Sequence, residues 1–286
     1  MKSFRYYILL LPALLLSMSV VLIPGLLTAY ISFTDWNGVS PQINWIGLGN
    51  FRAIFADNVF WKALGNNIRW TILFVTVPVF IGMLSAVLLL GRRINATLYQ
   101  LIYLFPYVLA PITNALLWLN IIFNPLTGVI GFLRKIGLNV PAPLGNINTA
   151  LYAVAAVDIW HYWGFLTVVY LASLRQTPMD QVEAAQAEGA NGWQVFRYVY
   201  FPSILPTVLL MYVMIIIFSF LTFDYVYLLT GGGPAHATEM LSTYAYTLGF
   251  STFQVGRASA VGLVMSMFGL IAAAFYTWLS RREITE

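Results

Sequence analysis

The sequence contains no cysteine and only two histidines, His161 and His236. Disulfides, thiolate metal sites and cysteine nucleophiles are therefore excluded, and a histidine-rich metal site is not expected. The three lysines, Lys2, Lys62 and Lys135, never follow a glycine, so the G-x-x-x-x-G-K-[ST] nucleotide-binding loop is absent. We expect no catalytic residue, no metal site and no cofactor bound by this chain, and any ATP chemistry has to come from another protein.

Charge is also scarce, because only 8% of the residues are charged whereas 60% are hydrophobic. This balance is typical of membrane proteins with several spans. Runs long enough to cross about 30 Å of hydrocarbon occur near Tyr7–Phe33, Ile68–Leu90, Leu98–Phe123, Thr149–Ala172, Ile204–Thr230 and Ala258–Ser280. The fold class predicted is all-α, a bundle of six transmembrane helices that forms one membrane domain over residues 1–286, with the lipid bilayer as a partner.

The basic residues indicate an orientation. If the helices alternate, one side of the membrane carries Lys2, Arg5, Arg92, Arg93, Arg175, Arg197, Arg281 and Arg282. The other side carries Arg52, Lys62, Arg69, Arg134, Lys135 and Arg257. The positive-inside rule then places both termini and residues 177–203 in the cytoplasm. The net charge of +4 reflects this topology, and no basic stripe with interleaved aromatics points to a nucleic-acid partner.

A polar, helix-prone insert at residues 177–206 separates two of the apolar runs. Thr177 is a good N-cap, Pro178 suits the first helical position, and Asp180 completes a capping box. A short helix is expected to run from there to Ala187. Gly189 is expected to end this helix in the left-handed conformation.

The rest of the insert predicts a second short helix and a docking surface. Asn191-Gly192 turns the chain into that helix, and Pro202 and Pro206 set the entry to the next span. Small side chains leave the backbone accessible to another protein at Ala184, Ala185, Ala187 and Ala190. Two short helices with an acidic residue at a membrane face are typical of a docking element.

This insert resembles a known motif. Glu183-Ala184-Ala185, Gly189 and Ile204-Leu205-Pro206 are similar to the EAA loop in the membrane subunits of bacterial ABC importers. The resemblance implies that the loop is a coupling helix held in a groove of a separate ATPase. The residues it assigns to coupling are Glu183, Ala184, Ala185, Gly189, Ala190 and Pro206. Glu188 departs from the family, whose members often carry Asp there. The alternative is an ordinary amphipathic loop.

Further segments resemble the maltose-type, carbohydrate-uptake branch of these permeases over nearly the whole chain. They are the aromatic outer loop at 34–69, Leu104–Pro106 with Ala115–Trp118 and Phe123–Gly128, Phe223-Asp224 with Leu229–Pro234 and Thr238, and Gly256–Ala260. The resemblance implies a second, homologous permease subunit in a heterodimer, two ATPase subunits that hold ATP and Mg²⁺, and an extracytoplasmic substrate-binding protein. It also implies the bacterial cytoplasmic membrane.

The glycine-rich stretch Gly231–Pro234 allows two interpretations. Its backbone amides could form an anion nest, but no lysine or helix-start signature accompanies them. A tight outer turn that ends the fifth helix is favoured.

Polar and aromatic residues within the fourth and fifth spans indicate a substrate site. A sugar requires flat aromatic surfaces and a few oriented polar groups, and the resemblance to maltose permease implies binding at mid-membrane. The candidate contacts are Trp160, Tyr162, Phe165, Phe218, Ser219, Thr222 and Asp224, and for each a packing or lipid-facing role is the alternative. Asp158 and His161 are expected to form a buried hydrogen-bonded pair with a structural role in preference to a proton relay.

The sequence thus predicts the permease subunit of an ATP-driven importer for a sugar or related polyol, and not an enzyme. An autonomous ion-coupled transporter or channel is the alternative, with Asp158, His161 and Asp224 as its ion path. Such proteins often contain an internal repeat, and none is visible. An intramembrane enzyme would need a nucleophile–base pair or a metal cluster, and neither spacing occurs.

Overall fold

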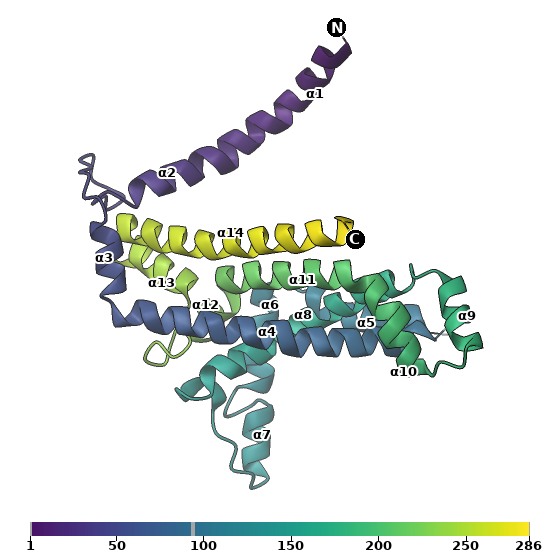
Figure 1. The fold of residues 1–286 in the computed structure, drawn as a ribbon. Coiled ribbons are helices and arrows are strands. Elements are labelled where there is room, and N and C mark those ends of the chain that lie inside the picture. Colours follow the sequence, from purple (N-terminus) through teal and green to yellow (C-terminus); the bar gives the residue numbers. More distant parts are fainter. Residues whose placement is uncertain (1, 93–94, 286) are drawn as a thin grey trace. The chain divides into compact units, whose positions relative to one another are not determined.

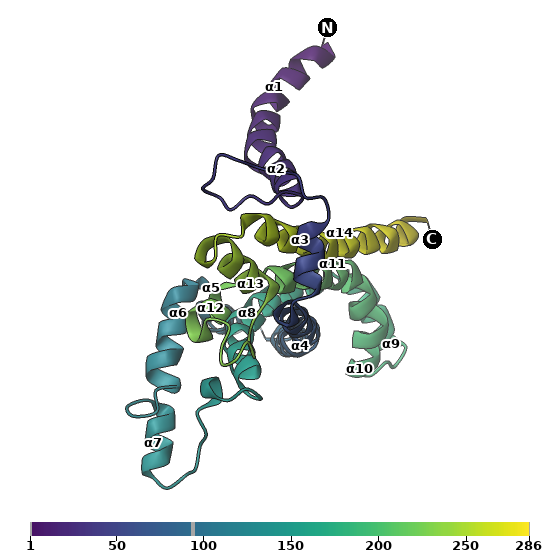
Figure 2. The same ribbon diagram turned by 90° about the vertical axis from the view of Figure 1, so that its left-hand side faces the viewer.

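The computed structural model describes residues 2–92 and 95–285, and within these ranges helices make up most of the chain (Figures 1 and 2). The one β pairing in this part of the chain is an isolated bridge between Thr34 and Trp45. Helices long and apolar enough to cross a membrane are Leu10–Ile31, Asn58–Leu90, Ala150–Leu174, Gly192–Leu221 and Val255–Thr277. Ala96–Val108 and Pro111–Ile122 add a sixth crossing if this pair, bent by 95°, counts as one span. The all-α membrane fold is confirmed, with five or six crossings.

The chain divides into two compact units. Unit 1 consists of the residues up to Trp61 together with Leu241–Met267. Its elements are α1 (Lys2–Ser17), the π-helical turn η1 (Met18–Leu22), α2 (Ile23–Ile31), α3 (Gly49–Phe55), α13 (Leu241–Tyr246), η5 (Thr247–Ser251) and the first part of α14 (Val255–Thr285). The most apolar stretch of Leu10–Ile31 buries none of its residues.

In unit 1 a buried polar contact joins α3 to the segment that follows α2. The Asn50 amide donates hydrogen bonds to the carbonyls of Ser32 (2.9 Å) and Thr34 (2.7 Å). Gly256 fits beside them because a Cβ there would lie 2.3 Å from the Thr34 carbonyl oxygen. Nearby, the side chain and backbone N–H of Asn44 donate to the Asp35 carboxylate, and these hydrogen bonds lower the pKa of that exposed carboxyl.

Unit 2 consists of Lys62–Met240 and the residues from Phe268 onward. Its elements are most of α4 (Asn58–Leu90), α5 (Ala96–Val108), α6 (Pro111–Leu117), η2 (Trp118–Ile122), α7 (Val129–Lys135), η3 (Pro143–Gly145), α8 (Ala150–Leu174), α9 (Met179–Ala187), α10 (Gly192–Val195), η4 (Phe196–Tyr200), α11 (Phe201–Leu221), α12 (Asp224–Thr230) and the last part of α14.

The core of unit 2 lies around α8, against which α5, α11 and α12 pack. α5 approaches α8 closely because residue 164 is glycine. A Cβ at Gly164 would lie only 1.7 Å from the Tyr103 carbonyl oxygen. Small residues allow such close backbone approach between membrane helices. The loop at 231–239 and the α9–α10 segment lie at opposite ends of this unit (Figure 1).

Two of the predicted spans are interrupted. The third breaks at Leu109 and Ala110, which are extended because a residue before a proline avoids the helical conformation and Pro111 lacks an N–H. The fifth breaks at Thr222, between α11 and α12. At this second break, the Asn67 amide donates to the Ser219 carbonyl (2.8 Å). Each interruption therefore exposes backbone groups that a continuous helix would use internally.

Other boundaries also differ from the expectation. The second span begins at Asn58, within the segment predicted to be an outer loop, and α3, α7 and α13 were not predicted. These three helices are at most seven residues long. Such short helices leave little periodic pattern in the sequence.

Candidate functional site

The α9–α10 segment forms at the predicted place but with a different start. Gly189 has a φ of +87° and follows the end of α9, as expected. The N-cap of α9 is Pro178, and it makes no side-chain hydrogen bond. Thr177 lies one residue too early and its hydroxyl donates instead to Ser203 Oγ (3.3 Å). The predicted capping box between Thr177 and Asp180 is therefore wrong.

The reciprocal capping box occurs at α10. Gln194 N–H donates to the Asn191 side chain (3.0 Å), and Asn191 N–H donates to Gln194 Oε1 (2.8 Å). From there the chain is helical without a break over Gly192–Leu221. The second helix is thus the start of the next span and not a separate short helix. Pro206 lies inside α11 and not at its entry.

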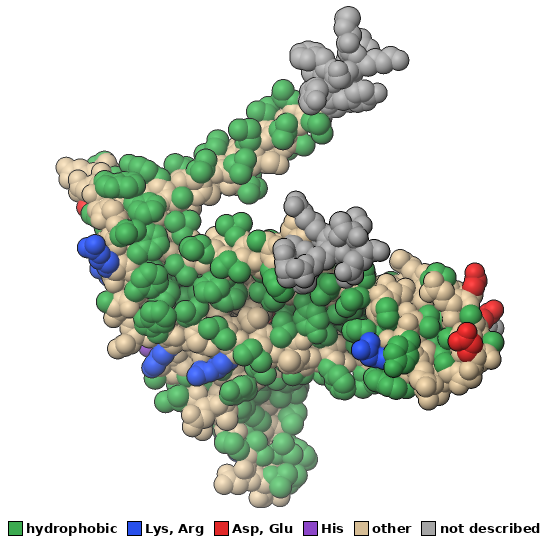
Figure 3. All heavy atoms as spheres, in the orientation of Figure 1, with side chains coloured by type: hydrophobic (Ala, Val, Ile, Leu, Met, Phe, Trp, Pro, Cys, Tyr) green, Lys and Arg blue, Asp and Glu red, His purple; other side chains and the backbone are tan. Residues whose placement is uncertain are grey.

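The α9–α10 segment is anchored by apolar side chains and presents polar ones. Val182 and Val195 are buried. Glu183 and Ala184 are exposed, whereas Ala185 and Ala190 are half-buried. In Figure 3 the acidic side chains gather over α9 at this end of unit 2. The segment therefore offers an exposed acidic, small-residue surface on a fixed base.

A cavity of about 370 Å³ lies in unit 2 where the two interrupted spans break. Tyr107 is near the end of α5, and Thr222 and Asp224 flank the second break. The lining residues are Trp70, Phe74, Tyr107, Asp158, His161, Tyr162, Ile215, Phe218, Ser219, Thr222 and Asp224. The volume lies within the range of about 300–1,000 Å³ that small-ligand pockets occupy.

Most of the predicted substrate contacts line this cavity, namely Tyr162, Phe218, Ser219, Thr222 and Asp224. Trp160 and Phe165 do not. The Trp160 ring packs edge-on against Trp118, with centroids 5.5 Å apart, and Phe165 stacks on Tyr107 at 4.7 Å. Both rings therefore pack on aromatic neighbours outside the lining of this cavity.

Sequence reasoning missed the α4 and α5 walls of the cavity. Trp70 and Phe74 stack with centroids 5.2 Å apart. Residues four apart share a helix face, so their spacing was a usable signal. Tyr107 and Ile215 gave no signal because their positions depend on the breaks and on packing between helices.

Asp158 and His161 also face the cavity, but not as the pair that was expected. The carboxylate and imidazole atoms are 3.8 Å apart, which is too long for a hydrogen bond. The prediction of a hydrogen-bonded pair is wrong. The His161 ring instead lies against two tyrosine rings, with centroids 5.2 Å from Tyr107 and 5.5 Å from Tyr225.

Ser219 is the buried polar group of the cavity wall. Its side chain is 2% exposed, and its Oγ has no hydrogen-bond partner in the part of the chain that the structure describes. Buried hydroxyls normally have a partner, and an unsatisfied one is costly. Because Ser219 lines the cavity, its hydroxyl is placed to bond a ligand there.

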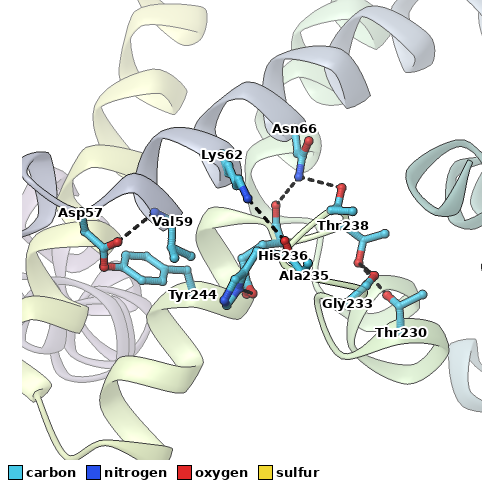
Figure 4. Close-up of polar contacts among 12 residues, drawn as sticks. Asp57, Val59, Lys62, Asn66, Thr230, Gly233, Ala235, His236, Thr238 and Tyr244 are labelled. Carbon is cyan, nitrogen blue, oxygen red and sulfur yellow. Dashed lines mark hydrogen bonds and ion pairs between the residues drawn. The ribbon is translucent and has the colours of Figure 1, made fainter. Parts of the chain in front are cut away.

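The glycine-rich segment at the opposite end of unit 2 forms the expected tight turn. Gly231 has a φ of +57° and ends α12, and its N–H donates to the carbonyls of Val226 and Tyr227. The Thr238 hydroxyl donates to the Gly233 carbonyl (2.8 Å) (Figure 4). The amides of Gly231 and Gly233 bond to carbonyls of this chain, which fits a structural turn.

Side chains from α4 and from the loop itself hold this turn in place. The Asn66 amide donates to the carbonyls of Ala237 and Glu239, both at 3.0 Å, and Lys62 Nζ donates to the Ala235 carbonyl at 3.4 Å. His236 pairs with Glu239 at 2.8 Å. The loop at 231–239 is therefore an ordered surface.

Comparison with known proteins identifies the class. The sequence profile of the binding-protein-dependent transport system inner membrane component family matches residues 49–285. The chain is 31% identical over 274 residues to the "Probable ABC transporter permease protein" of Pyrococcus horikoshii, covering 95% of this chain and 94% of that one. It is 28% identical to the multiple sugar-binding transport system permease protein MsmF of Streptococcus mutans, covering 89% and 87%.

A solved structure shares the fold. The crystal structure of a bacterial alginate ABC transporter, in complex with a periplasmic protein bound to an alginate pentasaccharide, aligns with a TM-score of 0.86. The two chains are 24% identical, and 98% of this chain and 95% of that chain are covered. The chain belongs to the binding-protein-dependent transport system inner membrane component family. It is a multi-pass membrane protein of the ABC importer permease class.

Proposed function

We propose that this permease carries a sugar or related polyol into the bacterial cytoplasm. The observation that carries the proposal is the cavity at the two helix breaks, which combines aromatic rings with polar side chains. Discontinuous membrane helices are where transporters build substrate sites. The relative MsmF, named as part of a multiple sugar-binding system, supports this substrate class.

The proposed topology has six spans, with the bent pair as one of them and both termini in the cytoplasm. Units 1 and 2 act together as one permease domain over residues 1–286. A second, homologous permease completes the path, because six membrane helices form only half of it. The extracytoplasmic binding protein delivers substrate at the ordered loop around Gly231–Pro234 and at the loop that contains Asp35.

Coupling to ATP hydrolysis is assigned to α9. The exposed Glu183 pairs with a cationic residue of a separate ATPase, and Ala184 and Ala185 allow close approach of the two backbones. Gly189 sets the angle between α9 and the membrane span that follows it. Two such ATPase subunits hold ATP and Mg²⁺, and their closure moves α9 and switches access to the cavity. ATP hydrolysis is thus on other chains.

Affinity purification in mild detergent tests the assembly. We expect recovery of an ATPase and a second six-helix chain, and we expect Glu183→Lys to lose the ATPase while the protein still inserts in the membrane. Asp35→Lys, which reverses an exposed charge far along the chain from α9, is the control and should retain the ATPase. Recovery of this chain alone, with ion-driven uptake, would favour an autonomous transporter and contradict the proposal.

A further inference from the structure

The charge of the cavity defines its substrate more narrowly. We propose that the cavity accepts neutral and amine-bearing carbohydrates and excludes those that carry a carboxylate or a phosphate. This inference rests on the proposed sugar transport, and it adds that the charge of a carbohydrate decides whether the cavity binds it (the charge rule). The residues that set the rule are Asp158 and Asp224.

The two aspartates reach the cavity from different elements. Asp158 lies on α8, and Asp224 is the first residue of α12 at the second break. No lysine or arginine is among the described lining residues. Arg69 precedes Trp70 in the sequence, but its side chain is exposed and donates to Asn66 Oδ1 at 3.2 Å. The described wall therefore carries two acidic groups and no cation besides His161 when protonated.

The remaining lining groups favour the same class of ligand. The rings of Trp70, Phe74 and Tyr162 line the cavity, and aromatic rings pack against the C–H faces of sugars and attract cations. The Ser219 hydroxyl, buried and without a partner in the described chain, can donate to or accept from a sugar hydroxyl. This unsatisfied hydroxyl supports a polar ligand in the cavity.

The consequence follows from desolvation. An anionic ligand would lose its hydration in the cavity and meet carboxylates where it needs a cation, which is strongly unfavourable. A neutral sugar donates its hydroxyl hydrogens to the same carboxylates in charge-assisted hydrogen bonds. An ammonium group gains both a carboxylate partner and cation–π contact. The fold alone does not decide this, because the solved alginate importer shares it.

Direct binding to the assembled transporter, without its delivery protein, tests the rule. The probes are three matched β-1,4-linked disaccharides, built from glucose, glucosamine and glucuronate, and the readout is equilibrium binding to the complex in lipid nanodiscs. We expect the glucose and glucosamine compounds to bind and the glucuronate compound to bind at least about ten-fold more weakly, as repulsion between nearby charges requires.

Variants of the two aspartates test whether this chain is responsible for the exclusion of anionic carbohydrates. Asp224→Asn and, separately, Asp158→Asn should narrow the difference in affinity between the glucose and glucuronate compounds. Asp57→Asn, at a residue that does not line the cavity, should leave that difference unchanged. Thermal unfolding and recovery of the ATPase show that each variant is folded, and the glucose compound reports an intact cavity.

The possible failures differ. If the glucuronate compound binds the wild-type complex as well as the glucose compound, the charge rule is overturned and sugar transport stands. If neither variant reduces the difference in affinity between the glucose and glucuronate compounds, Asp158 and Asp224 do not cause the exclusion of anionic carbohydrates. Absence of binding by all three compounds overturns both the proposed substrate class and the rule.

Discussion

The geometry of the α9–α10 segment is determined by local sequence, whereas that of the membrane cavity is determined by packing between distant helices. The segment is built from contiguous residues whose conformation follows from local chemistry, such as the left-handed Gly189 and the capping box at Asn191. The cavity draws on residues from Trp70 to Asp224, and it exists only because two spans break and pack around α8. A single substitution in the segment should therefore abolish coupling, whereas a single substitution in the cavity should only reduce the affinity for sugar.

The largest effect is expected at the end of α9. Gly189 has a φ of +87°, and proline is restricted to a φ of about −65°, so Gly189→Pro has to redirect the chain after α9. We expect ATP-dependent uptake to fall to background with membrane insertion intact. Gly192→Ala, at a position where a Cβ meets nothing within 4 Å, is the matched control. Uptake by the Gly189→Pro variant near the control level would refute a coupling role for this angle.

A stability effect is expected where the scaffold of the cavity is most tightly packed. Gly164→Leu places side-chain atoms where the Tyr103 carbonyl lies, so α5 has to move away from α8. We expect a loss of about 3 kcal/mol or more in unfolding free energy, measured by thermal unfolding in nanodiscs. Gly65→Ala, with no atom within 4 Å of its Cβ, should leave the unfolding temperature unchanged. Equal unfolding temperatures for the two variants would mean that α5 and α8 are not in close backbone contact at Gly164.

A moderate effect is expected from the cavity wall. Ser219→Ala removes the hydroxyl that has no partner among the described residues, so it costs the substrate one hydrogen bond and the fold none. Sugar affinity should fall about ten-fold, corresponding to one hydrogen bond, with ATP hydrolysis by the complex retained. Ser266→Ala removes a hydroxyl that bonds within α14 and should not change affinity. An unchanged affinity in Ser219→Ala would remove Ser219 from the site.

The smallest effect is expected at Trp160, a sequence-predicted contact that packs against Trp118 outside the cavity. Trp160→Phe keeps an aromatic ring at that interface, so sugar affinity should change by less than about two-fold, whereas Tyr162→Ala should reduce it several-fold more. Competition binding on both variants makes the comparison. A larger loss in Trp160→Phe than in Tyr162→Ala would place the sugar on the other face of α8.

The same comparison explains how much could be predicted from sequence. Apolar length and local turn chemistry predicted the membrane class, the end of α9 at Gly189 and the turn at Gly231. They misplaced the cap of α9, because Thr177 and Pro178 are both acceptable at helix starts and only the structure decides between them. The break at Thr222 has no proline, so the sequence contains little sign of it.

The cavity was predicted in part for related reasons. Ser219, Thr222 and Asp224 were found because polar groups within a span are rare and need a purpose. Trp70 and Phe74 were missed because aromatic residues in a span are common, and their role depends on which helices meet. Trp160 and Phe165 were included because residues close in sequence on α8 lie at similar depth but on different faces.

In the proposed mechanism, substrate recognition in the cavity and coupling at α9 are separate parts of an ATP-driven permease. The most direct measurement compares wild type and Glu183→Lys in proteoliposomes that contain both permeases and the ATPases, with sugar binding and ATP-dependent uptake measured on the same preparation. The account predicts that Glu183→Lys binds sugar with unchanged affinity and imports none. Continued ATP-dependent import by this variant, or import by the wild type without the ATPases, would contradict it.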